Sequence, residues 1–243
     1  MPEKISVALF DLDGVLTDTA AVHRRAWKAV FDEFLAGRNP GPFWPFTDAD
    51  YLGYVDGRSR ADGIREFLKS RGITIPEGEL DAAEGEPTVH ELGNRKNRLF
   101  LSFLARDGVH VYPGSLAYLT AVRTAGLGTG VVTASANANE VLSVADLTRF
   151  VDVCMDGVEI AHRGLRGKPA PDAFLAAAQA LDAKPDQAAG FEDSIAGVRA
   201  GRAADFGYVV GVDRVHDGTQ AEALRRAGAD VVVTDLAELG SRR

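Results

Sequence analysis

Residues 7–19 read VALFDLDGVLTDT, and this stretch decides the fold. Its unbroken apolar run ends at Asp11 and Asp13, two carboxylates that stand one residue apart. Such a run is typical of a buried parallel strand, and open α/β sheets bind ligands where their strands end. Gly14 would then let the backbone turn tightly beside an anion or a metal ion. An ordinary strand followed by an Asp-Gly turn explains this stretch equally well, so its role depends on the rest of the chain.

Composition sets the frame for the whole chain. Its 243 residues, 46% of them hydrophobic, suit one α/β domain that carries a smaller insertion. The net charge of −8 argues against a nucleic-acid partner, and an anionic substrate would need a few locally placed cations. The single cysteine, Cys154, lies in an apolar run, which indicates a small buried side chain and no disulfide framework. The N-terminal apolar run is too short for a signal peptide or a membrane span, so we expect a cytoplasmic protein with no membrane partner. We also expect either a monomer or a weak homodimer.

Residues 17–106 are predicted to form a small all-helical module inserted after the first strand. Apolar residues recur at helical spacing over residues 19–34, 60–70 and 89–105. The segment 40–46 is rich in proline, glycine and aromatic residues, and the sequence assigns no chemistry to it.

From residue 107 onward, strand and helix patterns alternate. We expect helices at residues 113–125, 138–147, 170–181, 195–202 and 220–227, and strands at residues 129–133, 151–155, 188–191, 208–212 and 230–233. This alternation predicts an α/β fold, a parallel sheet covered on both faces by helices. Residues 1–16 and 107–243 would form this sheet domain.

Polar side chains follow the expected strand at residues 129–133. Thr133, Ser135 and Asn137 offer two hydroxyls and an amide where a helix begins, which is the arrangement of a phosphate site. Capping of that helix by Ser135 or Asn137 is the commoner explanation of the same pattern.

Two further signals follow later strands. Lys168 precedes two prolines at a helix start, and these rigid neighbours would hold a side chain that is usually a solvated surface lysine. Glu192 and Asp193 follow the apolar strand at residues 188–191. Residues of these types at the ends of successive strands suit a phosphate together with a magnesium ion.

Together these residues resemble the four motifs of the haloacid dehalogenase superfamily. Residues 11–17, DLDGVLT, match its first motif, Thr133 its second, Lys168 its third, and Glu192 with Asp193 its fourth. The resemblance covers almost the whole chain. It implies a Rossmann-like parallel sheet with the first strand central and a helical cap domain inserted between the first and second motifs. Residues 17–106 stand at that position in this chain.

The resemblance also implies Mg²⁺ as cofactor. A phosphate dianion about 4 Å from a carboxylate meets a repulsion of roughly 8 kcal/mol at an effective dielectric near 20, so attack by a carboxylate requires cations. Lys168 and Mg²⁺ would supply them. The metal ligands would be Asp11, the backbone carbonyl of Asp13, and Asp193, with Glu192 nearby or acting through water.

The implied catalytic residues are Asp11, Asp13, Thr133 and Lys168. Asp11 would form an aspartyl phosphate while Thr133 and Lys168 hold the transferring oxygens. Asp13 would protonate the leaving oxygen and later deprotonate the acceptor hydroxyl.

Within the superfamily the sequence is most similar to the β-phosphoglucomutase subfamily. The matching cap residues are His23, Trp27, Arg60, Lys96 and Asn97. In that subfamily the arginine and lysine hold the phosphate that is not transferred, and the histidine couples cap closure to the general acid. Alternatives are packing of Trp27 in the cap core, capping or packing by His23, and solvation of Arg60. Ala136 and Gly63 replace a lysine and a serine of the subfamily, which affects the exact substrate more than the reaction.

The expected function is therefore interconversion of β-glucose 1-phosphate and glucose 6-phosphate through an aspartyl phosphate and a bisphosphate intermediate. The sugar phosphate is the expected partner. One alternative is a phosphatase of the same fold that hydrolyses a small sugar or polyol phosphate. A non-catalytic binding member of the fold is the other, but such a protein has no use for a costly cluster of like charges.

Overall fold

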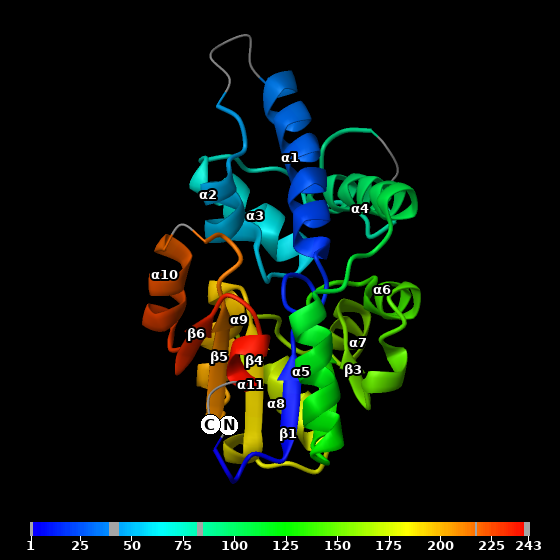
Figure 1. The fold of residues 1–243 in the computed structure, drawn as a ribbon. Coiled ribbons are helices and arrows are strands. Elements are labelled where there is room, and N and C mark those ends of the chain that lie inside the picture. Colours follow the sequence, from blue (N-terminus) through cyan, green and yellow to red (C-terminus); the bar gives the residue numbers. More distant parts are fainter. Residues whose placement is uncertain (1, 39–43, 82–84, 217, 241–243) are drawn as a thin grey trace. The chain divides into compact units, whose positions relative to one another are not determined.

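The computed structural model describes residues 2–38, 44–81, 85–216 and 218–240. The chain forms two compact units (Figure 1): Met1–Thr19 together with Val109–Arg243, and Ala20–Gly108. The boundaries of these units lie two or three residues from the domain boundaries expected after residues 16 and 106. No helix among the described residues is long and apolar enough to cross a membrane.

The first unit is built on a parallel sheet of six strands in the order β3-β2-β1-β4-β5-β6. Its strands are β1 (Val7–Phe10), β2 (Gly128–Val132), β3 (Val153–Met155), β4 (Ala188–Glu192), β5 (Tyr208–Val212) and β6 (Val231–Val233). β1 lies between β2 and β4, and Phe10 pairs in register with Val131 on one side and Phe191 on the other. The predicted α/β class with a central first strand is confirmed.

Both faces of β1 are packed. Leu9 belongs to a buried cluster with Phe174 and Phe206, whereas Phe10 stacks on Phe191 with ring centroids 4.5 Å apart. Successive side chains of a strand point to opposite faces, so an entirely apolar strand requires helices on both sides of the sheet.

The helices of this unit follow the predicted alternation, with additions. They are α5 (Pro113–Thr124), α6 (Ala138–Val144), α7 (Gly157–His162), α8 (Asp172–Ala180), α9 (Ile195–Ala203), α10 (Thr219–Ala227) and α11 (Ala237–Gly240), with 3₁₀ turns η2 (Thr148–Phe150) and η3 (Pro185–Gln187). The sequence pattern did not predict α7, which Asp156 caps by accepting from the Glu159 backbone N–H at 2.8 Å. Pro171 is the N-cap of α8, so this helix begins two residues later than predicted.

The second unit is helical throughout its described regular elements. These are α1 (Thr19–Arg38), which begins at the boundary, α2 (Asp48–Asp50), the π-helical turn η1 (Tyr51–Val55), α3 (Arg60–Ser70) and α4 (Val89–Asp107). Its core contains Phe31, Phe46 and Phe67, whose ring centroids lie 4.3 to 4.9 Å apart. In the aromatic segment 40–46, Phe46 is therefore a core residue, Trp44 is 74% exposed, and residues 40–43 lie outside the described residues.

Candidate active site

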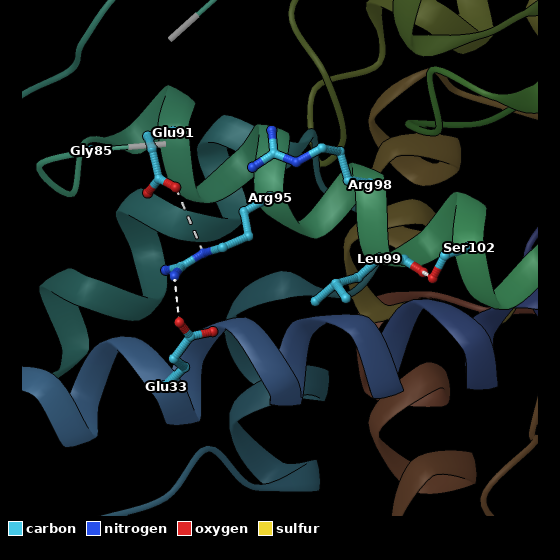
Figure 2. A pocket seen from close by; sticks show the side chains of 7 residues that line it. All are labelled: Glu33, Gly85, Glu91, Arg95, Arg98, Leu99 and Ser102. Atoms are coloured by element: carbon cyan, nitrogen blue, oxygen red, sulfur yellow. Dashed lines mark hydrogen bonds and ion pairs between the residues drawn. The ribbon is translucent and has the colours of Figure 1, made fainter. Parts of the chain in front are cut away.

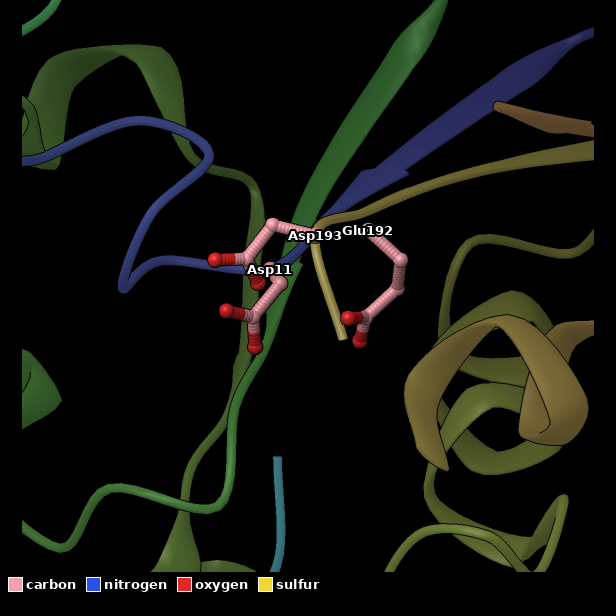
Figure 3. A group of neighbouring side chains, drawn as sticks. All are labelled: Asp11, Glu192 and Asp193. Carbon is pink, nitrogen blue, oxygen red and sulfur yellow. The ribbon is translucent and has the colours of Figure 1, made fainter. Parts of the chain in front are cut away.

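Three carboxylates meet at the carboxyl edge of the sheet. Asp11 directly follows β1, Glu192 ends the neighbouring strand β4, and Asp193 follows it. One oxygen of each lies within 4.8 Å of the others, and all three residues are buried (Figure 3). The register of β1 against β4 explains the meeting, because the Asp11 backbone N–H donates to the Phe191 carbonyl at 2.9 Å.

Lys168 is the cation of this cluster. Its ammonium donates to Asp11 Oδ1 at 2.6 Å and to the Val132 carbonyl at 2.8 Å, and it forms an ion pair with Glu192. Burial lowers the pKa of Lys168, but the two carboxylates outweigh burial and hold this pKa above its ordinary value. Lys168 is therefore charged at any physiological pH.

The cluster has more negative than positive charge. Burial raises the pKa of Asp11 well above its ordinary value, and the nearby charges of Glu192 and Asp13 raise it further against the opposing effect of Lys168. Buried carboxylates that repel one another, with only oxygen donors converging, are the surroundings in which a hard divalent cation binds well. The residues present thus fit Mg²⁺.

Asp13 lies in the turn after β1, and hydroxyl groups surround its carboxylate. Thr19 donates to Asp13 Oδ1, and Thr133 donates to Asp13 Oδ2 at 3.5 Å. The hydroxyl of Thr17 lies 2.7 Å from that of Thr19, and both threonines are buried. The sequence indicated no separate role for either threonine; Thr17 entered only as the last residue of the DLDGVLT motif, and Thr19 only through its place just after the two aspartates.

The loop after β2 folds on itself. Thr133 Oγ1 accepts from the Ser135 backbone N–H at 3.1 Å, and Ser135 Oγ accepts from the Asn137 N–H at 3.3 Å. Gly157 presses against this loop, since a Cβ added there would lie 2.6 Å from the Ala134 carbonyl. Asn137 occupies the N-cap position of α6 without a capping hydrogen bond from its side chain, so the capping alternative is wrong for Asn137, whereas Ser135 serves the turn.

In the second unit, three of the predicted cap residues lie together. Lys96 is 3% exposed; its ammonium contacts His23 Nδ1 and lies 5.2 Å from the centroid of the Trp27 ring and 4.8 Å from that of Phe100. Trp27 also stacks on Phe31 in the core, as the packing alternative expected. The electron-rich faces of these rings attract the ammonium and fix its position beside His23.

The other two predicted cap residues lie on α3 and α4. Arg60 begins α3, and its side chain packs against Gly93 of α4, where an added Cβ would lie 3.3 Å from Arg60 Cδ. Arg60 is half-buried, so it is not the fully solvated residue of the alternative, and this burial lowers its pKa. Asn97 follows Lys96 on α4 and is half-buried.

A separate pocket of about 410 Å³ opens on α1 and α4 of the second unit (Figure 2). Arg95 bridges it, with ion pairs of 3.0 Å to Glu33 and 3.7 Å to Glu91. Its lining residues are Glu33, Gly85, Glu91, Arg95, Arg98, Leu99 and Ser102, none of which belongs to the predicted site.

Comparison with known proteins identifies the family. A family model for haloacid dehalogenase-like hydrolases matches residues 5–205, and the chain belongs to this family. Within it, the chain is 54% identical to the β-phosphoglucomutase of Mycobacterium tuberculosis (strain CDC 1551 / Oshkosh), over 98% of this chain and 93% of that protein. It is 29% identical to the β-phosphoglucomutase of Bacillus subtilis (strain 168), over 97% and 92% of the two chains. The crystal structure of a β-phosphoglucomutase from Clostridium difficile superimposes with a TM-score of 0.75 at 25% identity, covering 97% of this chain and 93% of that one.

Proposed function

We propose that this enzyme is a β-phosphoglucomutase that interconverts β-glucose 1-phosphate and glucose 6-phosphate. The observation that carries the proposal is the buried cluster of Asp11, Lys168, Glu192 and Asp193 at the carboxyl edge of the sheet, in a chain 54% identical to a β-phosphoglucomutase over nearly its full length. The similarity supports the reaction and the cluster supports its chemistry.

Asp11 is the nucleophile. Its Oδ1 is bonded to Lys168, and its second oxygen attacks phosphorus, forming the aspartyl phosphate as the bond from phosphorus to the sugar oxygen breaks. Lys168 offsets the charge of the incoming phosphate, and the Thr133 hydroxyl holds one of the transferring oxygens. Asp11, the Asp13 carbonyl and Asp193, with Glu192 nearby, would hold Mg²⁺. The bound ion would neutralise part of the negative charge of the carboxylates and the phosphate.

Asp13 handles the proton. It gives a proton to the sugar oxygen as this oxygen leaves and takes one from the hydroxyl that later attacks the phosphoenzyme. The Thr19 hydroxyl orients the Asp13 carboxylate for both steps, which leaves the single O–H of Thr133 to donate to the transferring oxygen.

The cap residues hold the second phosphate. Arg60, Lys96 and Asn97 provide positive and polar groups for the phosphate that is not being transferred, and Lys96 is already buried beside His23. A mutase needs such a second site because its bisphosphate intermediate must turn around without losing phosphate to water.

Phosphorus NMR tests the proposal. The purified protein is mixed with Mg²⁺, β-glucose 1-phosphate and a trace of β-glucose 1,6-bisphosphate, and glucose 6-phosphate is expected with little inorganic phosphate. Inorganic phosphate as the main product would overturn the mutase assignment and indicate a sugar-phosphate phosphatase of the same family.

A further inference from the structure

Arg214, in the loop after β5, reaches the turn that follows the two aspartates. Its Nε donates to the Gly14 carbonyl at 2.7 Å, and its Nη2 donates to the Val15 carbonyl at 3.3 Å. Its Nη1 donates to the Thr234 carbonyl at 2.9 Å. One guanidinium thus ties the turn after β1 to the segment after β6.

The guanidinium is held in a fixed plane. It lies 3.6 Å from the centroid of the Tyr112 ring, and the Arg214 side chain is only 12% exposed. Its Nη1 forms an ion pair of 4.0 Å with Asp235 Oδ2. A lysine could not reproduce this geometry, because an ammonium lacks the planar fork that reaches several carbonyls and stacks on a ring.

Gln220 of α10 connects the same loop to Asp193. Its Oε1 accepts from the backbone N–H groups of Arg214 at 2.9 Å and Val215 at 3.0 Å, and its Nε2 donates to the Asp193 carbonyl at 3.0 Å. Gln220 is 6% exposed, so these bonds are shielded from water. The loop after β5 therefore contacts both the turn after β1 and the loop after β4.

These two segments touch each other at the candidate metal ligands. Gly14 has a φ of +87°, and a Cβ added there would lie 1.8 Å from Asp193 Oδ2. The backbone next to Asp13 and the side chain of Asp193 thus share one narrow space. A small shift of either segment changes the position of the other.

We propose that Arg214 and Gln220 are positioning residues that set the distance between the backbone at Asp13 and Asp193, and so determine the affinity for the divalent cation. This inference rests on the proposed function, because it gives these ligands to a catalytic cation. Partners behind metal ligands commonly change metal affinity by about 10- to 100-fold when they are removed.

Titration of the full chain with Mn²⁺, followed by the electron paramagnetic resonance signal of the free ion, tests the inference without turnover. Mn²⁺ stands in for Mg²⁺ because both prefer oxygen ligands. Arg214→Met is expected to weaken Mn²⁺ binding about 10-fold or more, and Gln220→Leu is expected to weaken it several-fold. The Mn²⁺ affinity of Arg214→Lys should lie between those of the wild type and Arg214→Met. In steady-state assays the apparent KM for Mg²⁺ should rise while the KM for the sugar phosphate stays constant.

Arg123→Met is the matched control. Arg123 also clamps a backbone carbonyl, that of Phe150 at 3.1 Å, but at the opposite end of the sheet, so this variant should lose some thermal stability and keep its Mn²⁺ affinity. Should Arg214→Met not fold, Arg214→Lys and Gln220→Leu carry the test. Unchanged Mn²⁺ affinity in the folded variants, with lowered Tm alone, would overturn the inference. The two proposals can fail separately. If the variants bind Mn²⁺ more weakly but the wild-type enzyme releases inorganic phosphate in the NMR test, the inference stands and the mutase proposal is overturned.

Discussion

Both ends of the sheet in the first unit carry a basic side chain bonded to carboxylate and carbonyl oxygens. At the amino end, Arg123 of α5 donates to Asp152 Oδ1 at 2.9 Å, and Asp152 Oδ2 accepts from the Thr129 backbone N–H at 2.9 Å. The two charged side chains are 33% and 40% exposed. One guanidinium meets one carboxylate, and water reaches both.

At the carboxyl end, one ammonium is shared. Lys168 contacts Asp11 and Glu192, with Asp193 within reach of both carboxylates, and all of these residues are buried. One positive and one negative charge close to water form an ordinary structural ion pair. Buried carboxylates that outnumber their ammonium instead raise the free energy of the folded chain. The difference indicates that the carboxyl end is arranged for a ligand and the amino end for stability.

Asp11→Asn should give the largest effect. Removing the proposed nucleophile is expected to lower turnover by a factor on the order of 10⁴ or more, because an amide cannot form the aspartyl phosphate. The free energy of unfolding, measured with urea in the presence of a chelator, should be no lower than that of the wild type, since one buried negative charge is gone. A variant that keeps a tenth of the wild-type turnover would refute the mechanism.

Lys168→Met and Arg123→Met compare the two ends directly. The first leaves buried carboxylates without their ammonium and should cost about 3–5 kcal/mol of unfolding free energy, whereas the second breaks a partly exposed pair and should cost about 1 kcal/mol. Urea unfolding of both variants measures the difference. Saturating Mg²⁺ should restore part of the stability of Lys168→Met and none of that of Arg123→Met. Equal costs at the two ends would contradict the comparison.

Asp13→Asn separates proton transfer from charge within the carboxyl end. Transfer to the sugar should fall by about 10²- to 10⁴-fold, because an amide cannot act as general acid or base. Mn²⁺ affinity should persist, since the proposed ligand is the backbone carbonyl of Asp13. The loss should be smaller with an aryl phosphate, whose leaving group needs no proton. A uniform loss on both substrates would refute the acid-base role.

The sequence predicted the sheet and the residues at its carboxyl edge because both depend on local pattern. Apolar runs such as that of residues 7–10 specify a buried strand, and parallel pairing brings the next residues to one edge, as found for Asp11 and Glu192. The short helix α7 was missed, because six residues are too few to show helical periodicity.

Contacts between distant parts of the chain could not be predicted. Arg214 bonds to a carbonyl 200 positions away, and an arginine in a polar loop is usually a solvated residue. The burial of Lys96 against aromatic rings could not be predicted either, because this contact depends on where α1 places Trp27. Such features require the positions of whole elements in space.

Asp152→Asn should give the smallest effect. It shows over which pH range the ion pair at the amino end contributes to the free energy of unfolding. Burial raises the pKa of Asp152, but hydrogen bonds from Arg123 and Thr129 outweigh burial and hold this pKa below its ordinary value. A depressed carboxyl pKa stabilises the fold above the unfolded value near 4, and this contribution is lost as the pH falls through the folded value. The wild type should therefore exceed Asp152→Asn in unfolding free energy by an amount on the order of 0.5 kcal/mol between pH 5 and 7, and the difference should vanish in stronger acid. Urea unfolding across pH 2–7 measures this difference.

Turnover at pH 7 is the control. Because the charges at the amino end of the sheet serve the fold, turnover of Asp152→Asn should stay at the wild-type level. A loss approaching that of Asp11→Asn would show that the two ends of the sheet are not divided between stability and catalysis.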